Sequence, residues 1–355
     1  MAYFNDKLIL ISDSLDNIDL FRLSKARIIR RHFNRWTKTS REFTIAKDVF
    51  LEYDISIDRE DTIYTIYQNT SMDLVLTLLR GKRTENIKLT KEPIPEIYYL
   101  NMELDDNKPH IFYLILLSSV EKKYRIYHHY FDGNDWITNV VDEIKVRELL
   151  NPIKVFIEDK KLILAYYDNV EDEQIYIKAF NLNEGKWGEK IRLTEGKKYR
   201  LYIDLIIKDD KLHISYCKYE GGNLVVIYER FKYVEGSIER EVEMELSNPE
   251  NPQYPTLIYY DNKLWVSWIE YDNVMSRYST DEGNTWSPIY LWKESKKGDI
   301  VRYKYDRAMK GSNILNYSFG KIYPEISFIG FGPIHNTREI PLKKKIWWPR
   351  INIII

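Results

Sequence analysis

The sequence predicts an all-β protein made of repeated units, and three observations lead to this prediction. Aromatic residues make up 14% of the 355 residues and include 29 tyrosines, a composition that favours half-buried strands. Short segments with alternating apolar and polar residues recur along the chain, whereas helical periodicity is poor. Two kinds of turn also recur with a shared spacing of about 50 residues.

The first recurring turn ends in a tryptophan. Its best copy spans residues 279–286 and reads S-T-D-E-G-N-T-W. Asp281 and Asn284 can bond back to backbone N–H groups, and Gly283 can take a positive φ angle, so this octapeptide should be a hairpin turn. Weaker copies end at Trp36, Trp136 and Trp187, and steps of about fifty place degenerate copies near residues 86, 238 and 336. These seven positions set the pitch of the repeat.

The second recurring turn is rich in Asp, Asn and Lys and precedes an alternating apolar strand. Clear copies are Asp106-Asn107-Lys108, Asp159-Lys160-Lys161, Asp209-Asp210-Lys211 and Asp261-Asn262-Lys263, and Asn5-Asp6-Lys7 follows the same pattern. Two turns that share one period indicate units of four short strands, and such units close into a ring. The sequence therefore predicts a seven-bladed β-propeller with four antiparallel strands per blade, as a single domain over residues 1–355.

The two ends of the chain are expected to close this ring. The predicted blades cover residues 1–46 together with 348–355, then 47–95, 96–150, 151–199, 200–252, 253–296 and 297–347. Residues 348–355 and 3–7, laid end to end, read as one inner strand followed by its turn. We expect the C-terminal strand to pair into the first blade, because closure removes an open sheet edge. An apolar tail or a linker into a further domain is the alternative.

The octapeptide resembles the Asp box, S-x-D-x-G-x-T-W, of the BNR repeats in sialidase-like β-propellers. The matching positions are Ser279, Asp281, Gly283, Thr285 and Trp286. The resemblance implies that this turn joins the third and fourth strands of a blade, on the face away from the usual active site. It also implies a structural role for these five residues rather than a catalytic role for Asp281.

Composition excludes several classes of function. The net charge is −1, so no basic excess points to nucleic acid as the main partner. Cys217 is the single cysteine and the six histidines are scattered, so we expect no disulfide, metal site or cofactor. No apolar run is long enough for membrane insertion. The N-terminus lacks signal-peptide features, which predicts a cytoplasmic protein, or an extracellular one if a leader has been removed.

Candidate ligand-binding residues lie on the face opposite the Asp box. Arg200, Arg302 and Arg350 each fall near the start of a predicted inner strand and could converge on an anionic group. Asp168 and Glu270 end predicted second strands and could face these arginines, while Tyr254 and Tyr271 lie in loops on the same face.

Three functions remain open. The leading one is a non-catalytic binding module that holds a carbohydrate or a protein over the central channel, because rigid blades present many loops. The alternative is a sialidase-like glycoside hydrolase using Asp168 or Glu270 with the arginines. Sialidases have six blades and an F/Y-R-I-P motif, whereas this chain reads Pro349-Arg350-Ile351 near its end. The third is a structural or assembly part of a larger protein. The ligand and the oligomeric state stay undetermined.

Overall fold

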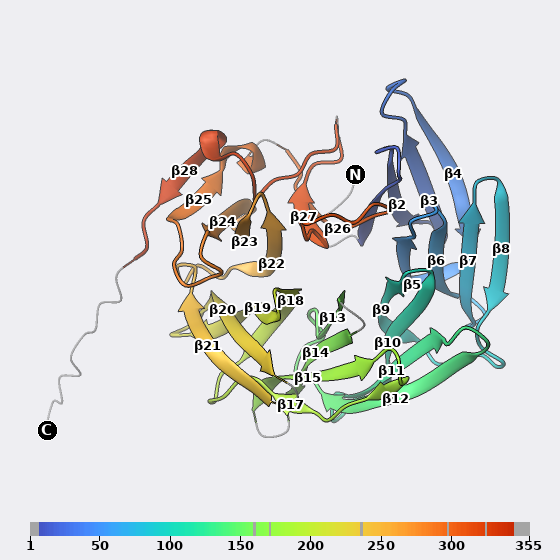
Figure 1. Cartoon of the computed structure of the whole chain (residues 1–355), viewed down its shortest axis with the longest axis horizontal. Helices are drawn as coiled ribbons and strands as arrows, with labels where there is room; N and C mark the ends of the chain where they lie inside the picture. Colours follow the sequence, from blue (N-terminus) through green and yellow to red (C-terminus); the bar gives the residue numbers. More distant parts are fainter. Residues whose placement is uncertain are drawn as a thin grey trace, which may run out of the picture.

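The chain folds into a ring of six β-sheets around a central axis (Figure 1). The computed structural model describes residues 7–158, 161–169, 172–234, 237–296, 298–323 and 325–343. These residues contain no α-helix; they contain β-strands and two short 3-10 helices, η1 (Lys293–Lys296) and η2 (Ile334–Asn336). No helix among them is long and apolar enough to cross a membrane. The fold is a six-bladed β-propeller.

In every blade the chain runs outward from the axis through antiparallel strands. The first three sheets contain β1 (Leu8–Ser12), β2 (Ile18–Ser24), β3 (Arg27–Phe33) and β4 (Ser40–Lys47); β5 (Val49–Ile57), β6 (Ile63–Asn69), β7 (Leu74–Arg80) and β8 (Arg83–Lys88); and β9 (Ile97–Asp105), β10 (Lys108–Ser118), β11 (Lys123–Phe131) and β12 (Trp136–Lys145).

The next three sheets follow the same order. They contain β13 (Ile153–Glu158), β14 (Lys161–Asn169), β15 (Glu173–Asn181), β16 (Lys186–Trp187) and β17 (Ile191–Arg192); β18 (Arg200–Lys208), β19 (Lys211–Glu220), β20 (Asn223–Val234) and β21 (Ser237–Glu245); and β22 (Gln253–Tyr260), β23 (Lys263–Glu270), β24 (Asn273–Ser279), β25 (Ile289–Trp292) and β28 (Thr337–Ile340).

Burial decreases from the axis to the rim, because inner strands are covered on both faces by neighbouring blades. In β14 and β23 almost every side chain is buried, which explains their near-continuous apolar sequences. In the outer strands β4 and β8 most side chains are exposed. Apolar side chains between adjacent sheets form the core of the molecule.

The predicted strand starts after the second kind of turn are confirmed. β10, β14, β19 and β23 begin at Lys108, Lys161, Lys211 and Lys263. Asp261 and Asn262 both have positive φ angles, as a two-residue hairpin turn between right-twisted strands requires.

The prediction of seven blades is wrong. The described residues of the predicted seventh unit, residues 297–347, do not form a sheet of their own. Its strands β26 (Val301–Arg307) and β27 (Tyr317–Gly320) extend the first sheet, whereas β28 pairs with β25 of the sixth. Figure 1 shows β26 and β27 between the sixth and first blades. A two-stranded hairpin therefore occupies the position where a seventh blade was expected.

The predicted mode of closure is also wrong. β26 lies beside β1 in parallel register, with Leu8 opposite Tyr303 and Ser12 opposite Arg307, so the inner edge of β1 is already paired. The prediction is wrong because it makes β1 the second strand of its blade, whereas β1 is the first, inner strand. Its β1–β2 loop contacts the β5–β6 loop, since the Ser14 N–H donates to Asp61 Oδ1 at 2.8 Å. β1 is therefore an inner strand like β5, and all four strands of the blade come from the N-terminal region. Residues 348–355 lie outside the described residues.

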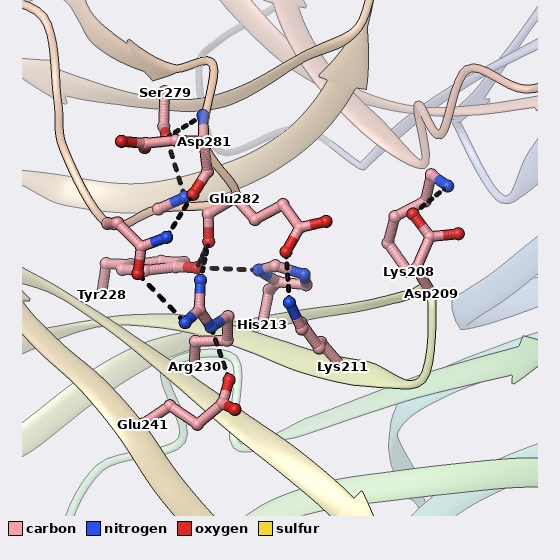
Figure 2. A network of polar contacts seen from close by, with 12 residues as sticks. Lys208, Asp209, Lys211, His213, Tyr228, Arg230, Glu241, Ser279, Asp281 and Glu282 are labelled. Atoms are coloured by element: carbon pink, nitrogen blue, oxygen red, sulfur yellow. Dashed lines mark hydrogen bonds and ion pairs between the residues drawn. The ribbon is translucent and has the colours of Figure 1, made fainter.

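The turn at residues 279–286 connects β24 and β25, the third and fourth strands of the sixth sheet, and binds the fifth blade (Figure 2). Within the turn, Ser279 Oγ accepts the Gly283 N–H at 2.7 Å, and Asp281 accepts the Thr285 N–H and hydroxyl at 2.8 and 2.7 Å. Across the blade boundary, the Glu282 carbonyl accepts hydrogen bonds from the Tyr228 hydroxyl and from Arg230. The turn thus stabilises both its own hairpin and the contact between two blades.

Candidate functional site

The two faces of the ring are defined by the alternating hairpins. The 279–286 turn lies at the same face as the turns between first and second strands, and Glu282 forms an ion pair there with Lys211, which follows the β18–β19 turn. We call this the lower face. The opposite, upper face carries the loops between second and third strands and the segments that enter each inner strand.

Four residues from successive inner strands surround the axis at the upper face. They are Tyr99 in β9, Asn151 just before β13, Tyr202 in β18 and Tyr254 in β22. We call these four residues, together with Arg302 of β26, the upper-mouth ring. Their equivalent positions in successive blades place them side by side.

The three tyrosines of this ring have left-handed backbone conformations. Their φ angles are 53°, 61° and 51° for Tyr99, Tyr202 and Tyr254, and Asn151 has a φ of 53°. Each tyrosine begins a β-bulge in which two residues of the inner strand face one residue of the next strand. Bulky residues rarely adopt positive φ angles, and such strained positions concentrate at functional sites. The repeated bulge redirects one tyrosine per blade.

Hydrogen bonds and ring contacts connect the ring members. The Tyr99 hydroxyl donates to the Leu149 carbonyl and accepts the Asn151 N–H at 3.0 Å. The Asn151 side-chain amide donates to the Ile203 carbonyl at 2.8 Å, in the bulge of the next blade. The centroids of the Tyr202 and Tyr254 rings are 4.4 Å apart. These contacts fix the side chains before any ligand arrives.

Arg302 adds a positive charge to this aromatic surface. Its guanidinium carbon lies 4.0 Å from the centroid of the Tyr317 ring and 5.3 Å from that of Tyr254. Tyr254 and Arg302 were both predicted as binding residues, and the structure brings them into contact. Arg302 is half-buried, so part of its side chain stays accessible beside the rings.

The phenols of the ring are neutral near pH 7. Burial raises the pKa of Tyr99 to about 12, and burial also raises the pKa of Tyr202 and Tyr254. A neutral phenol donates hydrogen bonds and offers a flat apolar surface, but it is a weak nucleophile and a weak base. The chemistry of these residues therefore favours recognition.

Further aromatic side chains lie outside the ring on the upper face. Tyr98 and Tyr124 meet edge to face at 6.1 Å, and Arg147 lies 4.8 Å from the centroid of the Tyr199 ring. Tyr271, another predicted residue, is 69% exposed and donates a hydrogen bond to Glu250 at 3.0 Å.

Three further predicted residues, Arg200, Asp168 and Glu270, are buried. Arg200 is 2% exposed, and its terminal nitrogens donate to the carbonyls of Glu173, Lys198 and Glu195. In this conformation its Nη1 and Nη2 atoms cannot clamp the carboxylate of a ligand. Arg350 lies outside the described residues, so its place relative to Arg200 and Arg302 stays a prediction.

The two predicted carboxylates contact neighbouring side chains. Asp168 accepts hydrogen bonds from Lys190 at 2.6 Å and from the Lys145 N–H at 3.0 Å. Glu270 accepts from the Trp268 indole at 3.2 Å, and burial raises its pKa. Among the described residues, no group of three or more His, Cys, Asp or Glu side chains is arranged to hold a metal ion.

Sequence reasoning missed Tyr99, Asn151 and Tyr202. A signal for them was present, because the steps from Tyr99 to Asn151, Tyr202 and Tyr254 are 52, 51 and 52 residues. This spacing matches the repeat. It identifies equivalent positions only when it is known which strand of its blade each residue belongs to.

No protein-family model matches the sequence, and a search of curated proteins gives no match. Solved structures do share the fold. A PL25 polysaccharide lyase, an ulvan lyase bound to -[GlcA(1-4)Rha3S]-, has a TM-score of 0.57 and 10% identity, with 93% of this chain and 96% of that chain covered. The polysaccharide lyase Uly1 has a TM-score of 0.55 and 10% identity, with 82% of each chain covered.

A lectin of Aleuria aurantia in complex with Fucα1-6GlcNAc is a more distant match. It has a TM-score of 0.48 and 10% identity, with 81% of this chain and 94% of that chain covered. The structural neighbours thus include polysaccharide lyases and fucose lectins. At 10% identity, these similarities concern the fold alone.

Proposed function

We propose that this propeller is a non-catalytic module that binds a carbohydrate at the upper-mouth ring. The convergence of Tyr99, Tyr202 and Tyr254 around the axis carries the proposal. Tyr99 and Tyr254 are half-buried, and their flat rings match the apolar faces of sugars, whereas Tyr202 is 6% exposed and packs against Tyr254. Arg302 and Asn151 supply donors for hydroxyl or anionic groups. Because the contacts described above hold these side chains in place, little conformational entropy would be lost on binding.

The chemistry of the described groups supports binding rather than cleavage. Glu52, beside the ring, accepts the Tyr99 and Leu100 N–H groups at 3.1 and 3.3 Å and pairs with Lys7, so its carboxylate is used structurally. The sialidase-like alternative gains no support from Arg200, whose Nη atoms contact carbonyls. The fold shared with carbohydrate-acting proteins is compatible with the proposal, but the tyrosines carry it.

A glycan array followed by calorimetry on the bound glycans tests this function. The wild-type protein should bind a defined subset of glycans, and Tyr254→Ala should weaken binding by about tenfold or more, as for central interface residues. Arg302→Gln serves as a second variant, because alanine at a left-handed position also perturbs the backbone. Tyr219→Ala is the matched control, since Tyr219 is exposed near the upper end of β19 and lies outside the ring.

Two results would contradict the proposal. Loss of binding in Tyr219→Ala, with Tyr254→Ala and Arg302→Gln unaffected, would place the ligand elsewhere on the surface. Shortened or unsaturated glycans after incubation with the wild-type protein, detected by mass spectrometry, would show that the module is an enzyme.

A further inference from the structure

Among the residues that the structure describes, no neighbouring blade covers one face of the first blade. Its other face packs against the second blade through residues such as Ile9, Phe21 and Ile28. The uncovered face carries Leu8, Leu10, Leu20, Val301 and Tyr303 near the axis, where the segment with Ile322, Ile326 and Phe328 packs over them. Farther out along β2 and β3 this cover ends. The first blade is therefore open on the side toward the sixth.

A cavity of about 590 Å³ occupies this opening. This volume lies within the range of roughly 300–1,000 Å³ typical of small-molecule sites. The floor of the cavity is apolar, formed by Leu20, Ile29, Val301 and Ile322. Leu20 and Val301 are 5% and 1% exposed, so the floor belongs to the core of the blade and is rigid.

Two arginines stand beside this apolar floor. Arg22 of β2 and Arg31 of β3 both line the cavity. Arg22 forms an exposed ion pair with Glu42, with Nη2 3.6 Å from Oε2, beyond hydrogen-bond distance. Arg31 Nη2 donates to Ser40 Oγ at 3.2 Å, and the Arg31 guanidinium carbon lies 5.0 Å from the centroid of the Phe33 ring. A guanidinium has five N–H donors, so in the part of the chain that the structure describes most of the donors of this pair remain open to a ligand.

The remaining wall carries a tyrosine and a carboxylate. Tyr323 is 81% exposed and lines the cavity, which leaves its ring free to stack on a flat ligand. Asp299 lies in the same wall and can accept hydrogen bonds from hydroxyl groups. An apolar floor, an exposed ring, a hydroxyl acceptor and two guanidinium groups together match a sugar chain that bears anionic substituents.

We propose that this cavity, here called the side groove, binds an anionic oligosaccharide. Its carboxylate or sulfate groups contact Arg22 and Arg31 through charge-assisted, bidentate hydrogen bonds. One of its sugar rings stacks on Tyr323. This site is separate from the upper-mouth ring and does not depend on it. Strand β26 lies between the two, with Val301 facing the groove and the next residue, Arg302, facing the axis.

Calorimetric titration with defined oligosaccharides tests the proposal. The probes are a trisaccharide of galacturonic acid, a sulfated disaccharide and neutral maltotriose. The wild-type protein should bind at least one of the acidic probes and bind maltotriose at least about tenfold more weakly. The double variant Arg22→Gln/Arg31→Gln should weaken acidic-probe binding by about tenfold or more, and Tyr323→Ala by a smaller factor. Arg22→Lys/Arg31→Lys should retain part of the affinity, because it keeps the charge but loses the bidentate geometry.

Three controls separate this site from others. Arg83→Gln removes an exposed arginine from β8, the outer strand of the second blade, which packs on the other face of the first blade, and it should leave binding unchanged. Tyr254→Ala should leave unchanged the component of acidic-probe binding that Arg22→Gln/Arg31→Gln removes, so the side groove and the upper-mouth ring can fail independently. Thermal unfolding of each variant reports whether it folds, and the exposed positions of Arg22 and Arg31 predict that it does.

Several outcomes would overturn the proposal. These are no binding of either acidic probe by the wild-type protein, equal binding of maltotriose, unchanged binding by Arg22→Gln/Arg31→Gln, or loss of acidic-probe binding in Tyr254→Ala with the arginine variant unaffected. A wild-type dimer that the arginine substitutions dissociate in sedimentation experiments would instead identify the groove as an interface between copies of the chain.

Discussion

Several bulky residues in this propeller adopt the left-handed backbone conformation, which is unfavourable for their side chains. Tyr99, Tyr202 and Tyr254 are left-handed, a conformation that costs of order 1–3 kcal/mol for a residue other than glycine. The same strain at one position of three blades is difficult to attribute to packing alone. At residue scale, these tyrosines are the strongest sign of a binding surface.

Gly283 illustrates the opposite case, in which the residue matches its conformation. It has a φ of +90°, and a Cβ atom there would lie 2.2 Å from the Tyr228 hydroxyl oxygen. Gly283→Ala should therefore lower the free energy of unfolding by about 2–4 kcal/mol, through backbone strain and the clash together. Denaturant unfolding measures this change.

Gly81→Ala is the matched control for this prediction. Gly81 also has a positive φ, +59°, but a Cβ atom at this residue would meet no other atom within 4 Å. Its substitution should cost about 1 kcal/mol, the backbone component alone. Equal costs at Gly81 and Gly283 would show that the contact with Tyr228 has no energetic role.

At the scale of elements, β26 connects the ends of the ring. Lys304 lies 2.8 Å from Asp54 of β5 and donates to the Met102 carbonyl at 2.8 Å, so one side chain connects β26 with two other blades. Burial lowers the pKa of Lys304, but the carboxylates of Asp54 and Glu103 outweigh burial and the net pKa is raised. The lysine is charged in the folded protein.

Lys304→Met should lower the free energy of unfolding by about 3–5 kcal/mol, because it leaves the Asp54 carboxylate buried without its partner. Urea unfolding measures this loss. Lys7→Met is the control, since the Lys7–Glu52 pair is partly exposed and should contribute about 1 kcal/mol or less. A cost for Lys304→Met as small as for Lys7→Met would mean that the buried pair is dispensable for closure.

Some strands of the propeller could be predicted from the sequence and others could not. Local turn chemistry placed β10, β14, β19 and β23 correctly, because Asp, Asn and Lys turns act within a few residues. The same chemistry misled at Asn5-Asp6-Lys7, since it does not state whether the next strand is first or second in its blade. The parallel pairing of β1 with β26 depends on hydrogen bonds between distant segments, for which a single sequence carries no local signal.

Only some residues of the upper-mouth ring could be predicted from the sequence. Arg302 was predicted because it lies near the start of a predicted inner strand, and Tyr254 because it lies in a predicted loop on the same face. Tyr99 and Tyr202 were not, because their importance comes from bulges that appear only when opposite strands are paired. The side groove was not predictable at all, because it results from the absence of a seventh blade.

For the whole molecule, buried histidines make stability dependent on pH. His110 and His128 lie in contact at 2.9 Å, and burial lowers the pKa of His110 to about 4 and that of His128 to about 2. Burial also lowers the pKa of His129 to about 4. In the unfolded chain each has a pKa near 6.5, so the unfolded state binds protons first as the pH falls.

The contribution of these histidines to stability is therefore complete above about pH 6.5 and is lost as the pH falls below this value. Each histidine should cost about 1.4 kcal/mol per pH unit down to its folded pKa. Urea unfolding across this range measures the slope. His128→Phe should give a shallower slope than the wild-type protein. Equal slopes for His128→Phe and the wild type would contradict the prediction.

The pairing of β1 with β26 also sets an order for synthesis. Leu8 and Tyr303 are direct neighbours in the sheet, yet 295 residues (303 − 8) separate them in the chain. At about 5–20 residues per second, the ribosome needs roughly 15–60 s to produce β26 after β1. Blades two to five can fold during this time, whereas the first strand keeps an unpaired edge. The ring is thus completed last at β1, and the nascent chain is most exposed to aggregation at the unpaired edge of this strand.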